Sequence, residues 1–431
     1  MFLIVENVRC LAGRHKLPIR PLTILTGENS SGKSTALSCL AAVCDPEGFP
    51  FAPGFNKAPF NLGNFDTIAT FKGGRAGRAK SFTIGYDTEI SDGVTAPQVE
   101  STFRSREGQV SLAEVAIRSG ADHATIALQE EERGYVGTIK AVLHGSEQSI
   151  GFQVPRRLGA ENVIRLQNLL LGVSDVTTQE EFKVRVDFLN GLTRLGFQMF
   201  PAVATSLAPI RTKPERTYGQ LAEFYAPGGD HIPFIIERLA REQDLNPDWK
   251  QLVTTLQQFG QESGLYRTLD VRLLGNKVGD PFQILVDVGG PPVNIIDVGY
   301  GVSQSLPVVV QSVLGAPRTM LLLQQPEVHL HPRAQAALGN LFARLVAGSN
   351  AQLVVETHSD YVIDRVRQQV ASGTLDAAKV MILYFERAAM ETTVSELTLD
   401  SNGNIRGAPP SYRQFFLAEE VALLGRARSH R

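Results

Sequence analysis

The sequence is poor in cysteine, and neither sign of charge dominates it. Its 431 residues include only three cysteines, Cys10, Cys39 and Cys44. Three thiols can build neither a disulfide framework nor a zinc site with four cysteine ligands, so the count favours a reducing compartment. Lys and Arg number 42 and Asp and Glu number 44. This balance excludes a global attraction to nucleic acid or anionic membrane, although it is compatible with a local basic groove.

Long hydrophobic runs are also absent. No segment approaches the roughly 18 consecutive apolar residues that suggest a membrane-spanning helix. The apolar start, Met1 to Val5, is too short for the core of a signal peptide and is followed by Glu6 and Arg9. Apolar residues still make up 43% of the chain, enough to bury a sizeable core. We therefore expect a soluble cytoplasmic protein without a membrane partner.

The hydrophobic pattern predicts an α/β fold with inserted segments. Residues 2–9 and 20–26 are expected strands, and the second runs into a Gly-rich turn and a helix. Short β-prone runs separated by turns predict an antiparallel meander over about 81–154, and helical patterns dominate about 158–263. From about 267 onward strands and helices alternate. Continuous apolar strands at 319–324 and 351–357 are typical of a parallel sheet covered on both faces.

The turn after strand 20–26 has the sequence of a phosphate-binding loop. Residues 27–35 read GENSSGKST, which fits G-x-x-x-x-G-K-[ST]. In such a loop, backbone N–H groups and the N-terminus of the following helix hold the phosphates. We expect Lys33 to reach the β- and γ-phosphates of ATP and the Ser34 hydroxyl to bind Mg²⁺. The predicted nucleotide-binding residues of this loop are Gly27, Asn29, Ser30, Ser31, Gly32, Lys33, Ser34 and Thr35.

A second candidate element follows the apolar strand 319–324, where the carboxyl end of a strand in an α/β sheet binds ligands. Gln324 and Gln325 occupy the positions where a Mg²⁺-binding and a catalytic carboxylate are expected. Glutamine can orient a water molecule, but it cannot act as a general base. Glu327 is the nearest carboxylate and could take over part of that role, or it could cap the loop. His329 and His331 follow, and either a metal site or loop packing would explain them.

Two further residues are candidates for contact with the γ-phosphate. His358 follows strand 351–357, where it could donate a hydrogen bond to a phosphate or serve as a structural histidine. Ser303 begins an apolar helix expected at 302–315. A helix start of this kind either binds an anion or is a plain cap.

Four motifs in this order resemble the head of an ABC-type ATPase. They are GENSSGKST, DVGYGVSQSLP, QQPEVHLHP and ETHSDYVIDRVR. More narrowly, the chain resembles bacterial AAA/ABC-like ATPases related to the overcoming-lysogenization-defect (OLD) proteins and to RecF and SMC heads. Some of these are ATPase subunits of anti-phage systems such as Septu and PARIS. The resemblance covers about 1–75 and 265–385, and APIRTKPER at 208–216 also looks similar.

The resemblance implies an ABC-type P-loop NTPase head with a mixed sheet, an antiparallel β subdomain and a helical insertion. Ser303 would be the signature serine that contacts a γ-phosphate held by another subunit, and His358 would be the switch histidine. With Gln324 at the metal position and Gln325 at the catalytic position, hydrolysis would be slow. The expected division is 1–80 for the first half of the ATPase core, 81–157 for the β subdomain, 158–264 for the helical insertion, and 265–431 for the second half with a C-terminal helix.

OLD proteins carry a nuclease module after the ATPase. About 46 residues follow residue 385, with only scattered acidic residues, so we expect a stand-alone ATPase without a nuclease of its own. The expected function is therefore an ATPase whose ATP-dependent assembly, as a homodimer or a higher even-numbered complex, controls a partner nuclease or toxin. Two alternatives stay open: a nucleotide-bound scaffold with degenerate catalysis, and a RecF-like repair ATPase that binds DNA. DNA binding would depend on basic residues of the middle segment, namely Lys183, Arg185, Arg194, Arg211, Lys213, Arg216, Arg238 and Arg241.

Overall fold

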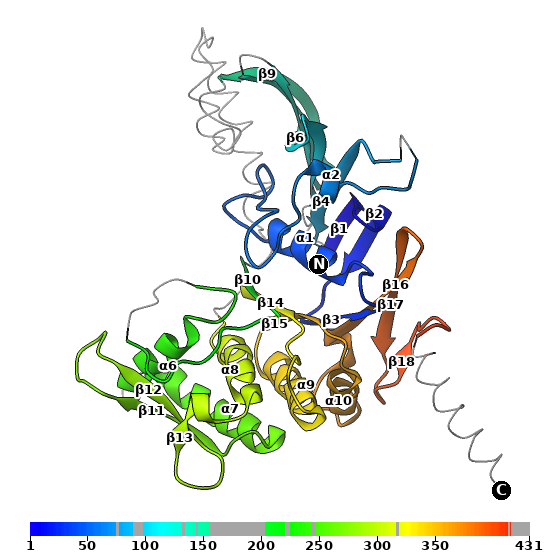
Figure 1. Cartoon of the computed structure of the whole chain (residues 1–431). Helices are drawn as coiled ribbons and strands as arrows, with labels where there is room; N and C mark the ends of the chain where they lie inside the picture. Colours follow the sequence, from blue (N-terminus) through cyan, green and yellow to red (C-terminus); the bar gives the residue numbers. More distant parts are fainter. Residues whose placement is uncertain are drawn as a thin grey trace, which may run out of the picture.

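The computed structural model describes residues 1–74, 77–88, 98–131, 134–143, 145–155, 203–219, 225–242, 246–315, 319–412 and 414. The expected helical pattern before residue 203 lies outside this range. So does the helix expected near 413–427, apart from residue 414. Within the described residues the fold is mixed α/β, with one mixed and one long antiparallel sheet (Figure 1).

The phosphate-loop strand lies in the middle of a mixed sheet of seven strands. The first five pair in parallel, the sixth pairs antiparallel with the fifth, and the seventh pairs antiparallel with the sixth. The two apolar strands at 319–324 and 351–357 share this sheet with it, as predicted. The order is β10 (Val203–Leu207), β14 (Thr319–Gln324), β15 (Gln352–Glu356), β3 (Leu22–Gly27), β16 (Val380–Ala388), β17 (Glu391–Leu399) and β18 (Ile405–Arg406).

Both faces of this sheet are covered, which explains the continuous apolar sequence of its strands. In β14, Met320 and Leu322 belong to one core, whereas Leu321 and Leu323 belong to the other. The first core contains α1 (Lys33–Val43) and apolar residues of the long antiparallel sheet. The second core contains the helices α6 (Ile232–Arg241), α7 (Pro247–Ser263), α8 (Tyr300–Val313), α9 (Pro332–Gly348) and α10 (Asp360–Ala371) (Figure 1).

Strands also occur within the segment expected to be a helical insertion and directly after it. Residues 203–207 (VATSL) form β10, which pairs with β14 at the sheet edge instead of extending a helix. Beyond α7, a small antiparallel sheet consists of β11 (Thr268–Leu273), β12 (Phe282–Asp287) and β13 (Val293–Asn294). Short 3₁₀ helices cover Ile295–Asp297 and Ala377–Lys379, and a short helix, α2, covers Phe65–Ile68.

The predicted meander is confirmed, but its sheet includes the start of the chain. Strand β1 pairs with β2 and β4, not with the phosphate-loop strand, so this sheet crosses the expected boundary between residues 80 and 81. The order is β2 (Leu11–Pro18), β1 (Phe2–Val8), β4 (Ser81–Asp87), β5 (Gln98–Arg106), β6 (Gln109–Ser119), β7 (Asp122–Glu131), β8 (Gly134–Leu143) and β9 (Ser146–Pro155).

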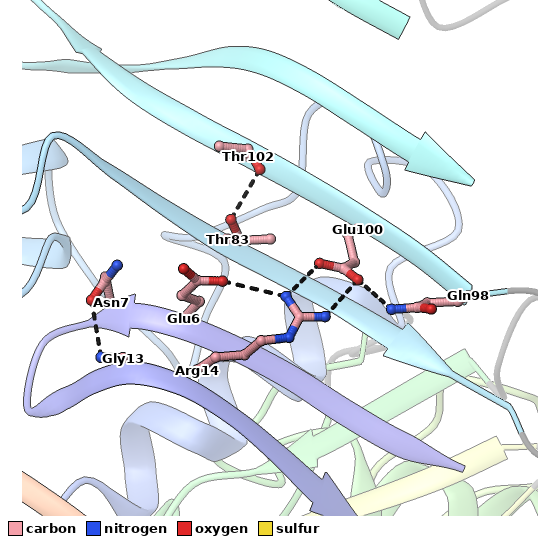
Figure 2. Close-up of polar contacts among 8 residues, drawn as sticks. All are labelled: Glu6, Asn7, Gly13, Arg14, Thr83, Gln98, Glu100 and Thr102. Carbon is pink, nitrogen blue, oxygen red and sulfur yellow. Dashed lines mark hydrogen bonds and ion pairs between the residues drawn. The ribbon is translucent and has the colours of Figure 1, made fainter. Parts of the chain in front are cut away.

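Polar side chains tie the first four strands of this sheet together, as Figure 2 shows. Arg14 on β2 donates two hydrogen bonds of 2.7 Å to the Glu100 carboxylate on β5, and one of 3.3 Å to Glu6 on β1. The hydroxyls of Thr83 and Thr102 lie 2.9 Å apart across β4 and β5. The guanidinium thus links the start of the chain to the meander.

Helix α9 packs so closely on α10 that one of its positions requires glycine. A Cβ atom at Gly339 would lie 2.8 Å from the backbone oxygen of Val362 and 2.8 Å from Cβ of Arg365. We predict that Gly339→Ala lowers the free energy of unfolding by about 1–3 kcal/mol, because the two helices must move apart. Gly348→Ala at the end of the same helix meets no atom within 4 Å. It should leave stability unchanged or raise it by up to about 1 kcal/mol. Denaturant unfolding of both variants checks this, and equal effects would contradict it.

Candidate nucleotide-binding site

The backbone of residues 27–33 curls in a way that requires glycine. Gly27 has φ +133° and Gly32 has φ +100°, a region that residues with a side chain rarely adopt. A Cβ atom at Gly27 would lie 2.1 Å from the backbone oxygen of Phe385 on β16. Two glycines of the sequence motif are therefore explained by the turn and by close packing on the neighbouring strand.

Residues distant in sequence hold this loop in place. Arg387 donates to the backbone oxygen of Ser30 at 3.0 Å, and the Thr392 hydroxyl donates to that of Ser31 at 2.9 Å. The backbone N–H of Thr392 also donates to the backbone oxygen of Cys10 at 2.8 Å. The β16–β17 hairpin and the β1–β2 turn thus support the loop from outside.

Lys33 is 3% exposed and folds back onto its own loop. Its Nζ donates to the backbone oxygens of Gly27 at 3.1 Å and Glu28 at 2.5 Å. Burial lowers the pKa of Lys33, whereas the negative charge of Glu356 opposes that shift. The ammonium group lies at the centre of the loop, where phosphate oxygens can replace the carbonyls as its partners.

Glu356, at the end of β15, is a site residue that sequence reasoning missed. The Ser34 hydroxyl donates to its Oε1 atom at 2.6 Å. The residue is 3% exposed, and within the described part of the chain its Oε2 atom is buried without a hydrogen-bond partner. The signal available in the sequence was an acidic residue ending an apolar strand, two positions before His358.

The two glutamines lie beside this carboxylate. Gln324 is the register partner of Glu356 in the parallel pair of β14 and β15. The backbone N–H of Gln325 donates to the backbone oxygen of Glu356 at 2.8 Å, and Gln325 has φ +43°. Of the two, Gln325 lines the cavity in front of the phosphate loop.

Glu327 is buried behind His358. Its Oε1 atom accepts a hydrogen bond from the backbone N–H of His358 at 2.8 Å. Burial raises the pKa of Glu327. Among the described residues that line the cavity, His358 is present and Glu327 is not. Burial and the charge of Lys33 lower the pKa of His358, which favours a neutral imidazole with a single N–H donor. In this arrangement Glu327 orients the backbone next to His358.

The cavity has a volume of about 630 Å³, within the usual range for small-molecule sites. Its lining contains Asn29 to Thr35, Gln325, Glu356 and His358. Phe71 and Arg78 also line it; Phe71 is 42% exposed, and the Arg78 guanidinium lies 5.4 Å from the centre of its ring. Arg9, Cys10, Asp66, Thr67, Ala69, Arg387 and Met390 complete the lining.

Ser303 lies apart from this cavity. It sits in the first turn of α8, where its hydroxyl donates to the backbone oxygen of Tyr300 at 2.9 Å. It lines a second cavity of about 530 Å³, together with Thr212, Lys213 and Pro307. A single chain therefore does not bring Ser303 and the phosphate loop into one cavity of the described residues.

Arg211 connects the two regions. It is 2% exposed and donates to the backbone oxygens of Gln304 at 3.0 Å and Gln325 at 3.3 Å. Burial lowers the pKa of Arg211 to about 10, against the opposing effect of Glu327. The side chain therefore joins the first turn of α8 to the turn after β14.

The basic residues considered for DNA contact differ in their exposure and pairing within the described range. Arg211 is buried. Arg216 pairs with Asp297, and Arg241 pairs with Glu237. Lys213 and Arg238 are exposed. The remaining three, Lys183, Arg185 and Arg194, lie outside the described residues.

His329 and His331 have packing roles. His331 accepts a hydrogen bond from the backbone N–H of Arg333 at 3.3 Å and so caps α9. The His329 ring lies 5.2 Å from that of Tyr300. Across the described residues, no group of three or more His, Cys, Asp or Glu side chains could hold a metal ion. No helix in the same range is long and apolar enough to cross a membrane.

The chain is similar to several known proteins. Residues 205–364 match the model of a family described as AAA domain, putative AbiEii toxin, type IV TA system. Over 371 residues the chain is 20% identical to the OLD nuclease of Thermus scotoductus, a match that covers 84% of this chain and 59% of the relative.

Residues 205–364 are thus similar to an AAA-type ATPase domain, and the chain is weakly similar to an OLD nuclease. It spans less than two thirds of that relative's length. Among solved structures, it is similar to the SMC head domain from Thermotoga maritima (12% identity, TM-score 0.38, 91% of this chain and 97% of that one). It is also similar to an SMC head bound to the C-terminal winged-helix domain of ScpA (13% identity, TM-score 0.45, 93% and 97%).

We predict that Lys33→Ala weakens ATP binding at least tenfold, about 1.4 kcal/mol, because a charge-assisted contact to the phosphates is lost. Lys57→Ala removes an equal charge outside the cavity, where Lys57 contacts Asp45, and should bind ATP like the wild type. Equilibrium titration with a fluorescent ATP analogue measures both. Equal affinities for the wild type and the Lys33 variant would contradict the assignment.

Proposed function

We propose that this chain binds ATP with Mg²⁺ in the phosphate-loop cavity and hydrolyses it slowly. The observation that carries the proposal is the convergence of Lys33, Ser34, Gln325, Glu356 and His358 on one cavity. They come from the ends of three adjacent parallel strands and the loops that follow. This edge of an α/β sheet is where such folds bind ligands.

Each side chain of the cavity would have a separate role at the phosphates. Lys33 would exchange its carbonyl partners for phosphate oxygens, and the neutral His358 would donate a hydrogen bond to the γ-phosphate. Gln325 would orient the attacking water molecule, and slow hydrolysis follows because an amide cannot accept the proton. Glu327 would hold the backbone at His358. Phe71 offers an aromatic face for the base.

The residues around Ser34 fit a magnesium ion. Mg²⁺ binds oxygen ligands, usually one or two carboxylates together with phosphates. The Ser34 hydroxyl and the buried, unpaired Oε2 atom of Glu356 are oxygen atoms of this kind. When bound, Mg²⁺ neutralises the negative charge that develops on the β- and γ-phosphates.

We further propose that two heads close around ATP and thereby control a partner. Because Ser303 lines a different cavity from the phosphate loop, a second copy related by two-fold symmetry could supply its Ser303 to the first copy's nucleotide. ATP then favours the closed form, since it contacts both copies only there. The relative is a nuclease and the matched family is described as a putative toxin. These names support an effector of nuclease or toxin type, and we propose that the pair acts in anti-phage defence.

The scaffold alternative is supported by the same glutamines, because neither can act as a general base. A steady-state hydrolysis assay separates the two. Turnover that disappears in the Lys33→Ala variant indicates an ATPase, whereas ATP binding without turnover indicates a scaffold.

We predict that ATP with Mg²⁺ converts the chain into a dimer or a higher even-numbered assembly, observable by light scattering. Ser303→Arg should prevent this conversion while the chain still binds ATP, because the arginine occupies the space that the other copy's γ-phosphate needs. Ser349→Arg, at the exposed end of α9, serves as the control and should assemble normally. A monomer at micromolar concentration in saturating ATP would contradict the composite site.

The defence role predicts a phenotype that depends on the nucleotide. Cells carrying this chain with its neighbouring genes should form fewer phage plaques than cells with an empty vector. Lys33→Ala should restore plaque numbers to the vector level, because the chain can no longer close around ATP. Plaque counts over a panel of phages measure this. Unchanged protection in the variant would contradict a role for ATP.

A further inference from the structure

We propose that Glu356 is the carboxylate ligand of the Mg²⁺ site. The metal-binding acid of this ATPase would then lie on β15, and not at the end of β14, where Gln324 stands. This inference rests on the proposed function, because it assigns a residue to the ion that accompanies ATP.

Glu356 contacts the phosphate-loop residue that is expected to bind the ion. Ser34 is the phosphate-loop residue whose hydroxyl is expected to bind the ion. That hydroxyl already donates to Glu356 Oε1 at 2.6 Å, across 322 residues of sequence. An ion held by Ser34 would therefore lie within reach of the same carboxylate. No other carboxylate accepts a hydrogen bond from Ser34 among the described residues.

One carboxylate oxygen of Glu356 is buried without a hydrogen-bond partner among the described residues. Glu356 is 3% exposed, and its Oε2 atom has no hydrogen-bond partner within the described residues. A buried carboxylate is unfavourable unless it is paired or coordinates a metal. The charge that acts on it from nearby is Lys33, whose ammonium group is bonded to the backbone of its own loop. A divalent cation would give the Oε2 atom of Glu356 the partner that it lacks.

Glu356 also stands at a suitable position on the sheet. Strand β15 lies between β14 and the phosphate-loop strand β3. Gln324 and Glu356 are register partners, so their backbones are about 4.8 Å apart, the spacing of neighbouring strands. Glu356 is one of the described residues that line the cavity, and Gln324, on the same face of the sheet, lies one strand farther from the phosphate loop. The negative charge absent from β14 is thus present one strand closer to the phosphates.

The test is titration with a fluorescent ATP analogue in excess Mg²⁺ and in EDTA, for the wild type and for Glu356→Gln. The wild type should bind more tightly with Mg²⁺. In the variant, the ratio of the affinity in Mg²⁺ to the affinity in EDTA should fall by about tenfold or more. Its affinity in EDTA should be equal or higher, because a negative charge facing the phosphates has been removed. Glu47→Gln, the same change at an exposed position outside the cavity, should match the wild type in both conditions.

A second variant moves the charge back. Gln324→Glu combined with Glu356→Gln should recover part of the Mg²⁺ gain, because the carboxylate returns on the neighbouring strand. Mn²⁺ bound to the protein–ADP complex, measured by electron paramagnetic resonance, should fall in the single variant and recover in the double variant. Thermal unfolding in EDTA without nucleotide should show no loss of stability for Glu356→Gln, since a buried charge is removed.

The outcomes separate the two proposals. If Glu356→Gln weakens binding equally in Mg²⁺ and in EDTA, Glu356 is only structural and this assignment is overturned. The same holds if the variant keeps the full Mg²⁺ gain. If the wild type binds the ATP analogue in neither condition, the proposed function fails as well.

Discussion

The register of three parallel strands is the constraint on which the site depends. Strand β15 pairs with β3 on one side and with β14 on the other, so that Glu356 lies opposite Leu25 and Gln324. A slip of one residue would turn every side chain of β15 to the opposite face. Glu356 would then leave the cavity, and Val355 would leave its core. Burial of apolar residues on both faces therefore fixes the positions of the polar side chains at the strand ends.

Buried polar groups connect this edge of the sheet to α8. Arg211 donates hydrogen bonds to the backbone oxygens of Gln304 and Gln325. Glu327 accepts one from the backbone N–H of His358. A buried charge is unfavourable unless hydrogen bonds compensate for its loss of hydration. If one hydrogen-bond partner is removed, the remaining group is buried without a partner and stability falls. Arg211 therefore joins the turn after β14 to the first turn of the helix that carries Ser303.

The cavity is closed by parts of the chain that are far apart in sequence. The β1–β2 turn contributes Arg9 and Cys10, and the β16–β17 hairpin contributes Arg387 and Met390. Phe71 comes from the connection between α2 and β4. The turn between β1 and β2 and the connection from α2 to β4 therefore line the candidate nucleotide site, beside the long antiparallel sheet. The coherence of that sheet depends on long-range pairs such as Arg14 with Glu100.

The sequence by itself determined the features that depend on local backbone geometry and on apolar periodicity. The phosphate loop, the apolar strands 319–324 and 351–357 and the meander were predictable, because glycine conformation and strand burial are encoded within a few residues. Tertiary structure alone decided the pairing of β1 with β4, the strand at 203–207, and the burial of Arg211 and Glu327. It also brought Glu356 to Ser34 across 322 residues. Such contacts depend on strand order and register between distant segments, which no local pattern encodes.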